Sequence, residues 1–353
     1  MRCLVDENIP FAAETFGSHA GLTRFSGREL CPQDLCGADA LIVRSTTQVD
    51  SALLAEHCPA FVGSCTSGLE HLDTDWLEAA GVAWAHAPGC NAQSVVEYVL
   101  CVLAALEVDL ATLAGVTIGI IGCGQVGGRL RECVRRLGAQ VRVYDPFLNR
   151  DQIPELGSLE WVCGADILCL HTPLTRSGPF PTAKMFGREQ LERLPPNAIL
   201  LNAGRGGVID EAQLLAFMRQ RPDLRVALDV WADEPLINTE LLGRAQIATP
   251  HIAGYSLEGK RRGTLQVYRA FCRHFGFAPT ELPELPPVAM EPVPDSLPAL
   301  LRRVYDPLID TRNLRQQCGG ASNADRGRAF DALRRGRVER RELGVAPIIS
   351  RKI

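Results

Sequence analysis

The segment VTIGIIGCGQVG, residues 116–127, decides the fold. Its first half is an apolar run typical of a buried strand, and its second half is a G-x-G-x-x-G turn made by Gly122, Gly124 and Gly127. Residues 125–137 then have the pattern of a helix. A glycine turn between a strand and a helix can hold the phosphates of a dinucleotide, because the free N–H groups at the helix start point at the ligand. We therefore predict a dinucleotide-binding unit around this segment.

An acidic residue after the next strand indicates which dinucleotide is bound. Residues 140–144 (QVRVY) have the pattern of a strand, and Asp145 follows directly. A carboxylate at this position can accept hydrogen bonds from the adenosine ribose hydroxyls and would repel a 2′-phosphate, so NAD is favoured over NADP. A glycine turn without a ligand is the alternative, and the strand, the helix and the acid together weigh against it.

Strands and helices alternate along most of the chain, which predicts an α/β fold with doubly wound parallel sheets. A long helix is expected over 91–113, with Ser94 and Glu97 as a capping box near its start. A shorter helix is expected over 75–80. The other expected strands lie at 1–5, 40–43, 61–62, 167–170, 198–201, 225–228 and 247–248.

Composition excludes several classes of protein. The 353 residues suffice for two or three domains, and the hydrophobic fraction of 46% supports a sizeable core. No apolar run reaches about 18 residues and the start has no secretory pattern, so we expect a cytoplasmic protein without a membrane span. The 13 cysteines form no C-x-x-C pair, which argues against a disulfide framework and a zinc site. The net charge of −4 gives no reason to expect nucleic-acid binding.

The amino-acid composition of the chain changes after residue 278. Residues 279–298 are rich in proline and read as a linker or extended arm. Residues 299–353 are rich in arginine and have too little apolar content to fold alone, so we expect them to pack on the main body or on another subunit. A solvated or subunit-facing surface explains these arginines better than a nucleic-acid patch.

Three polar residues each follow a predicted strand of the same sheet. Arg205 lies in NAGRG, Glu234 in DVWADEP and His251 in TPHIAG. Ligands of open α/β sheets bind outside the carboxyl ends of the strands, so these side chains can converge on one ligand. Each alone is more often a loop residue without a function, and only the combination with the dinucleotide motif favours a catalytic site.

Their chemistry suits the oxidation of a 2-hydroxy acid. A histidine can accept the hydroxyl proton, and a carboxylate bonded to its other ring nitrogen fixes the tautomer and stabilises the imidazolium. An arginine can grip a carboxylate with two parallel hydrogen bonds and polarise a carbonyl group.

These motifs, in this order over about residues 41–263, resemble the D-isomer-specific 2-hydroxyacid dehydrogenases. The resemblance implies a Rossmann-type NAD-binding domain (96–256) inserted in a flavodoxin-like α/β substrate domain (1–95, completed by 257–278). It also implies a C-terminal dimerisation segment (279–353) and a homodimer.

The resemblance also assigns roles. Arg205 would anchor the substrate, His251 would be the acid/base group and Glu234 its partner. Besides the three glycines, the NAD contacts implied by motif position are Gln125, Val126, Asp145, Thr172, Ala203, Asp229 and Gly254.

Several further segments resemble one subgroup of this family, whose substrate is a phosphorylated hydroxy acid; they are LVDENIP (4–10), VRSTT (43–47), APGCNA (87–92), HTPL (171–174) and GYSLEGK (254–260). The resemblance implies Ser45, Thr66 and Tyr255 as substrate contacts. The hydroxyl groups at 64–67 could also form a phosphate cradle, although an ordinary capped turn explains them too. Two alternatives stay open: another D-2-hydroxy acid such as 3-phosphoglycerate as substrate, and an NADH-sensing binding protein without turnover.

Overall fold

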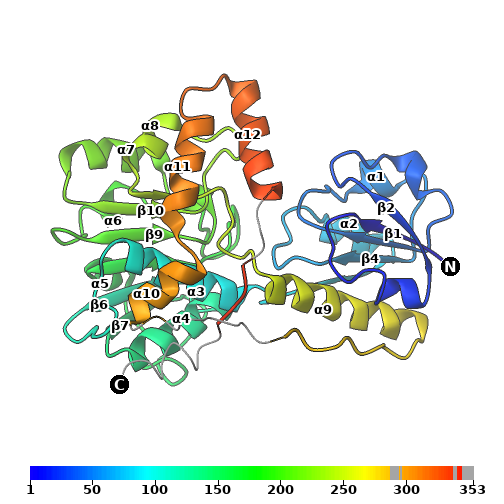
Figure 1. Ribbon diagram of the computed structural model, residues 1–353, viewed down its shortest axis with the longest axis horizontal. Coiled ribbons are helices and arrows are strands. Elements are labelled where there is room, and N and C mark those ends of the chain that lie inside the picture. Colours follow the sequence, from blue (N-terminus) through cyan, green and yellow to red (C-terminus); the bar gives the residue numbers. More distant parts are fainter. Residues whose placement is uncertain (287–293, 295, 337–339, 344–353) are drawn as a thin grey trace. The chain divides into compact units, whose positions relative to one another are not determined.

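A computed structural model describes residues 1–286, 294, 296–336 and 340–343. The chain forms two compact units (Figure 1). Unit 1 consists of Met1–Asn91 and Ser256–Pro287, and unit 2 of Ala92–Tyr255 and Val288–Ile353. Each unit contains one parallel sheet covered by helices, so the prediction of an α/β fold with parallel sheets is confirmed.

Unit 1 has five parallel strands in the order β2-β1-β3-β4-β5. Helix α9 packs on this sheet through Val267, Tyr268 and Phe271, which are buried against strand residues such as Val5 and Ile42. The strands are β1 (Arg2–Asp6), β2 (Gly21–Phe25), β3 (Ala40–Val43), β4 (Phe61–Ser64) and β5 (Ala83–His86), and the helices are η1 (Phe16–Ser18), η2 (Pro32–Leu35), α1 (Ser51–Leu54), α2 (Thr74–Ala79) and α9 (Leu257–Phe275).

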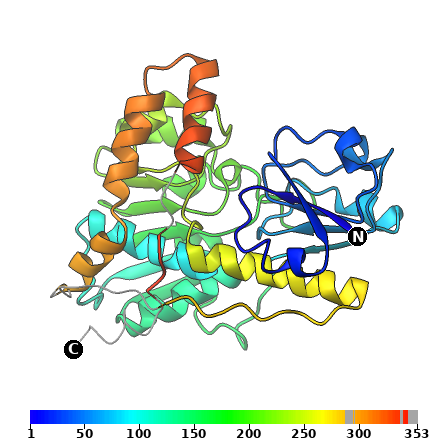
Figure 2. The same cartoon turned by 45° about the vertical axis from the view of Figure 1, so that its right-hand side comes forward.

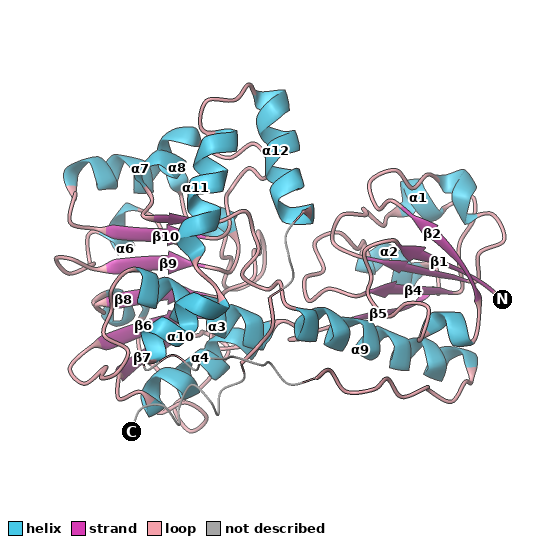
Figure 3. Ribbon diagram, in the orientation of Figure 1, coloured by secondary structure: helices cyan, strands magenta, loops and turns pink. Residues whose placement is uncertain are grey.

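Unit 2 has six parallel strands in the order β11-β10-β9-β8-β6-β7, drawn in magenta in Figure 3. The chain runs from β6 to β7 on one side and then returns to β8 on the other, so the strand order reverses at β6. Ligands of such sheets bind beside this switch point. The strands are β6 (Thr117–Ile121), β7 (Gln140–Tyr144), β8 (Ile167–Leu170), β9 (Ile199–Asn202), β10 (Arg225–Leu228) and β11 (Ile247–Ala248).

Two apolar cores cover the faces of the unit 2 sheet. Helices α3 and α4 pack with Ile118 and Ile120 on one face, and α5 to α8 pack with Ile121 and Leu168 on the other. The helices are α3 (Ala92–Ala105), α4 (Gln125–Arg136), α5 (Leu159–Cys163), α6 (Arg188–Leu191), η3 (Gly206–Val208), α7 (Glu211–Gln220) and α8 (Thr239–Arg244).

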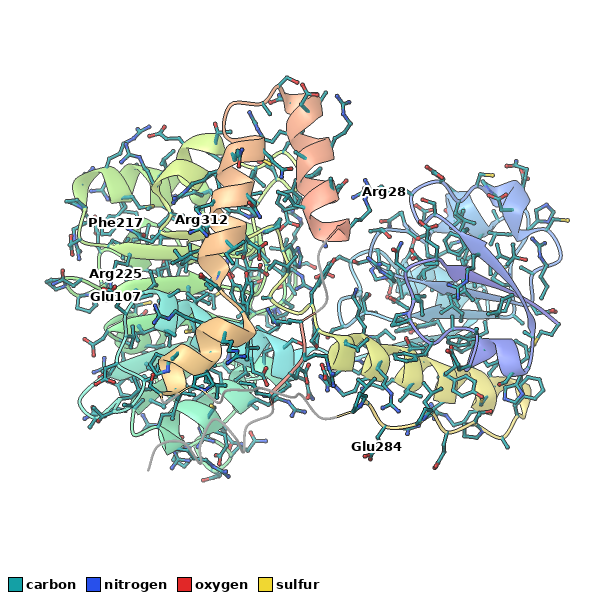
Figure 4. All side chains as sticks on the ribbon, in the orientation of Figure 1. Arg28, Glu107, Phe217, Arg225, Glu284 and Arg312 are labelled. Carbon is teal, nitrogen blue, oxygen red and sulfur yellow. The ribbon has the colours of Figure 1, made fainter. Side chains whose placement is uncertain are left out.

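Two predictions about helix α3, its C-terminal end and its capping box, are wrong. The helix ends at Ala105 and not at residue 113, because Glu107 takes the left-handed conformation (φ 59°) and the amides of Glu107 and Val108 bond back to Ala104 O and Leu103 O. Arg225 Nη1 also donates to Leu106 O (3.1 Å), and Figure 4 labels Arg225 beside Glu107.

The expected capping box of Ser94 and Glu97 is wrong, because the helix starts at Ala92 and both residues lie inside it. Their side chains bond to the C-terminal segment instead. Ser94 Oγ donates to Glu342 Oε1 (2.7 Å), and Glu97 Oε2 accepts from Leu343 N (3.1 Å).

The C-terminal helices α10 (Leu297–Val304), α11 (Pro307–Cys318) and α12 (Asn323–Arg335) pack on unit 2. Leu300 and Leu301 pack in the core beside α3, while Leu314 and Phe330 join the core on the opposite face. Helices α11 and α12 lie side by side in both views (Figures 1 and 2). Part of the expected linker over 279–298 and part of the arginine-rich end lie outside the described residues. In the described part of the chain, no helix is long and apolar enough to cross a membrane.

Candidate active site

The three glycines of the turn after β6 differ in the space around their Cα atoms. Gly122 has φ +87°, and a Cβ built on it would lie 2.9 Å from Thr172 Cγ2. A Cβ on Gly127 would lie 2.0 Å from the Gly122 carbonyl oxygen, so only glycine allows this helix to approach the strand. A Cβ on Gly124 would meet no atom within 4 Å, which leaves its backbone open to a ligand. These surroundings match the tight turn, the close packing and the phosphate approach that a dinucleotide site requires.

Asp145 is held against the glycine turn. Its Oδ2 accepts from Cys123 N (2.9 Å) and its Oδ1 from Phe147 N (3.1 Å). The side chain is only partly buried, so its carboxylate can still accept hydrogen bonds from ribose hydroxyls.

Buried polar atoms lie next to the first glycine. In the described part of the chain, both ring nitrogens of His171 and the Thr172 hydroxyl are buried without a hydrogen-bond partner. Burial lowers the pKa of His171 to about 4, so its ring is neutral at physiological pH. Polar groups of this kind are expected where a ligand completes the hydrogen bonding, so the residues present fit NAD.

The other predicted NAD contacts lie at the same edge of the sheet. Gln125 and Val126 form the first turn of α4, Ala203 directly follows β9, and Gly254 follows the His251 loop.

The buried Asp229 organises the loop that carries His251. Its Oδ1 accepts from Thr249 Oγ1 (2.6 Å) and Ile252 N (2.8 Å), its Oδ2 from Ala253 N (2.9 Å), and its carbonyl from His251 N (2.7 Å). Burial raises the pKa of the Asp229 carboxyl, and its hydrogen bonds oppose that effect. The role of Asp229 as an NAD contact stays a prediction from the motif, and its hydrogen bonds fix the loop in addition.

His251 and Glu234 form a direct pair. Glu234 Oε2 lies 2.8 Å from His251 Nδ1, and Glu234 Oε1 accepts from Trp231 N (3.0 Å). Burial alone would raise the pKa of Glu234, but the charge and hydrogen bond of His251 outweigh it and the net pKa is lowered. The His251 side chain is 33% exposed, so its other ring nitrogen can reach a ligand.

Arg205 follows β9 in extended conformation, and its Nη1 donates to Gly204 O (2.9 Å). The next residue, Gly206, lies directly against Trp231: a Cβ on Gly206 would come within 1.9 Å of the Trp231 carbonyl carbon. The Arg205 loop and the Glu234 loop are therefore in backbone contact.

Two of the predicted substrate contacts lie in unit 1. Ser45 is exposed just beyond β3, and Thr66 lies just beyond the neighbouring strand β4, with Val43 opposite Ser64 in the register. Thr66 Oγ1 lies 2.9 Å from Ser64 Oγ, which in turn lies 2.7 Å from His71 Nε2. Tyr255, the third, lies in unit 2.

One residue that contacts a predicted substrate contact, Arg334, was not predicted from the sequence. Arg334 Nη2 of helix α12 donates to Tyr255 Oη at 3.4 Å. The two residues are far apart in the chain, and no local motif links them.

Comparison with known proteins identifies the family. The profile of the D-isomer specific 2-hydroxyacid dehydrogenase NAD binding domain matches residues 103–253. The chain is 46% identical to the erythronate-4-phosphate dehydrogenase of Cellvibrio japonicus and 47% identical to that of Azotobacter vinelandii, with 97% of this chain and 93% of each relative covered. The chain belongs to the erythronate-4-phosphate dehydrogenase group of the D-isomer-specific 2-hydroxyacid dehydrogenases.

Solved structures agree with this family membership. The NAD-bound 3-phosphoglycerate dehydrogenase of Entamoeba histolytica matches with a TM-score of 0.66 and 25% identity, over 78% of this chain and 95% of that one. The D-lactate dehydrogenase of Aquifex aeolicus, at 23% identity and a TM-score of 0.65, covers 77% and 95% and shares the fold. The Rossmann-type NAD-binding fold predicted from the sequence is therefore confirmed.

Proposed function

We propose that the protein oxidises 4-phospho-D-erythronate to (R)-3-hydroxy-2-oxo-4-phosphooxybutanoate with NAD, as a step in pyridoxal 5′-phosphate biosynthesis. The observation that carries the chemistry is the contact of 2.8 Å between His251 Nδ1 and Glu234 Oε2, at the carboxyl edge of a sheet with a dinucleotide turn. The similarity to erythronate-4-phosphate dehydrogenases over 97% of the chain supports the choice of substrate.

His251 is the proposed acid/base group. Glu234 occupies Nδ1, so Nε2 is the nitrogen that takes the proton of the substrate hydroxyl. The ionised Glu234 stabilises the imidazolium that results. Bound NAD supplies the hydride acceptor. Arg205 holds the substrate carboxylate and polarises the carbonyl group that forms.

The proposed cofactor contacts are those predicted from the sequence, with Asp145 selecting NAD. For the substrate, we propose contacts from the hydroxyl groups of Ser45, Thr66 and Tyr255. We assign residues 96–256 to NAD binding, and residues 1–95 with 257–278 to substrate binding.

We further propose a cytoplasmic homodimer in which residues 279–353 contribute to the pairing of subunits. Sedimentation of the full chain at micromolar concentration tests the assembly, and a monomer there would refute it. Duplex DNA should not bind to the arginines of this segment.

The decisive experiment is a spectrophotometric assay of NADH formation with 4-phospho-D-erythronate, 3-phospho-D-glycerate and D-lactate. We expect the highest kcat/KM with 4-phospho-D-erythronate. A higher kcat/KM with 3-phospho-D-glycerate would show that this acid is the better substrate. No turnover with any of the three acids would favour an NADH-sensing binding protein.

A further inference from the structure

Helix α12 packs directly on the loop that carries Glu234. A Cβ built on Gly327 would lie 3.5 Å from both Pro235 Cγ and Leu236 Cδ2. Arg326 Nη1 donates to Ile237 O (3.5 Å), and Phe330 is completely buried in the core beneath the helix. The position of α12 is therefore fixed relative to Glu234.

The last turn of α12 brings Arg334 to the catalytic residues. Its Nη2 donates to Tyr255 Oη at 3.4 Å. Burial raises the pKa of Glu234, the charge and hydrogen bond of His251 lower it, and the charge of Arg334 lowers it further. The Nε of Arg334 is buried and has no hydrogen-bond partner among the residues described. The neighbouring Arg335, by contrast, is exposed.

Arg334 is only partly exposed and its buried Nε lacks a hydrogen-bond partner among the described residues, which is costly unless a ligand supplies one. Among the described residues, no hydrogen bond joins Arg334 to Glu234, whose oxygens bond to His251 and to Trp231 N. The preferred partner of a guanidinium is a planar pair of anionic oxygens, as in a phosphate or a carboxylate.

Arg205 and Arg334 come from different elements, and each is linked to the loop of Glu234: Gly206, next to Arg205, lies against Trp231, and the charge of Arg334 acts on Glu234. Arg205 follows β9, whereas Arg334 belongs to the C-terminal segment. A hydroxy acid with a phosphate at its far end carries two anionic groups, and two separate cations can hold them.

We propose that Arg334, together with Tyr255, binds the phosphate of the hydroxy acid substrate, while Arg205 holds its carboxylate. The assignment rests on the proposed function for the identity of the acid. It gives the C-terminal segment a direct part in substrate selection.

The test is steady-state kinetics of full-length Arg334→Gln and Arg334→Lys, with Arg335→Gln as the matched control, on 4-phospho-D-erythronate and on D-erythronate. We expect Arg334→Gln to raise KM for the phosphorylated acid by about tenfold to a hundredfold, since charged hydrogen bonds carry this much affinity. Its KM for D-erythronate and its affinity for NADH should change by less than about threefold. Arg334→Lys should recover part of the loss, and Arg335→Gln should match the wild type.

Two results would overturn the assignment. One is an unchanged KM for the phosphorylated acid in Arg334→Gln. The other is an equal loss on both acids, which would make Arg334 a support for Glu234 and not a phosphate ligand. If Arg334→Gln does not fold, Arg334→Lys decides by the same comparison. If the wild type prefers 3-phospho-D-glycerate, the proposed substrate is wrong, and the pair 3-phospho-D-glycerate and D-glycerate tests Arg334 in the same way.

Discussion

The backbone of Gly206 lies so close to the backbone of Trp231 that a Cβ on Gly206 would come within 1.9 Å of the Trp231 carbonyl carbon. This contact joins the loop of Arg205 to the loop of Glu234, because Glu234 Oε1 accepts from Trp231 N. The distance between Arg205, the proposed substrate anchor, and Glu234, the proposed partner of the base, therefore depends on residue 206 being a glycine.

Gly206→Ala should consequently damage both stability and activity. Either loop must move by more than an ångström, and we expect a loss of about 2–3 kcal/mol in the free energy of unfolding. Misplacement of this size at a reacting centre should lower kcat/KM about a hundredfold. Gly243→Ala, in helix α8 where a Cβ would meet no atom within 4 Å, is the control and should be neutral or stabilising. Equal behaviour of the two variants would contradict the argument.

Glu211 should make the stability of the protein fall as the pH rises. Burial raises the pKa of Glu211 from 4.5 to about 7, against the hydrogen bond that its Oε1 accepts from Ala232 N (2.7 Å). A folded-state pKa above the unfolded one means that the folded chain binds more protons between these values. Stability is thus lost as the pH rises from about 4.5 to about 7, and stays lower above that.

Glu211→Gln removes this charge but keeps an oxygen for the Ala232 amide. Urea unfolding should show the variant to be more stable than the wild type by about 1–2 kcal/mol at pH 8, and nearly equal to it at pH 4.5. Glu240→Gln is the control of opposite sign, because hydrogen bonds from Arg219 and Arg244 lower the pKa of Glu240. A Glu211→Gln variant that is no more stable at pH 8 would show that the carboxylate is well solvated.

Cofactor choice should depend on Asp145, whose carboxylate is held by Cys123 N and Phe147 N. We expect the wild type to prefer NAD over NADP by at least about 2 kcal/mol, because a 2′-phosphate would lie against this charge. Asp145→Ala should reduce the preference, as measured by kcat/KM with each cofactor. The exposed Asp151 offers a control, and Asp151→Ala should change nothing. Equal efficiency of the wild type with both cofactors would refute the role of Asp145.

The central strands could be predicted from the sequence, whereas two edge strands could not. The runs ALIV of β3 and ILCL of β8 are wholly buried, and such continuous apolar runs are typical of central parallel strands. Strands β2 and β5 form the edges of the unit 1 sheet, and β2 is largely exposed. GLTRF has no continuous apolar run, and AWAH is a short stretch of only partly buried residues, so neither has the pattern of a fully buried strand.

The site was predictable where each role depends on a short motif. His251, Glu234 and Arg205 follow consecutive strands of one parallel sheet, so topology alone brings them to one edge. The contact between Arg334 and Tyr255 depends on how α12 packs on the 234–237 loop, which no local pattern encodes. For the same reason the partners of Ser94 and Glu97, in the segment after α12, could not be predicted.

The catalytic roles predict a specific contrast between three variants. His251→Ala should lower kcat by about 10²–10⁴-fold, the usual cost of losing a general base, without weakening NADH binding. Glu234→Gln should be milder and should move the rising limb of the pH–rate profile to lower pH, because a neutral amide no longer stabilises the imidazolium. Arg205→Lys should raise KM and lower kcat together, since a point charge cannot replace a bidentate fork. The exposed His274 of α9 offers the control, and His274→Ala should keep turnover. If His71→Ala or His171→Ala abolished turnover while His251→Ala kept it, the base would be misassigned and the pair of His251 and Glu234 would be structural only.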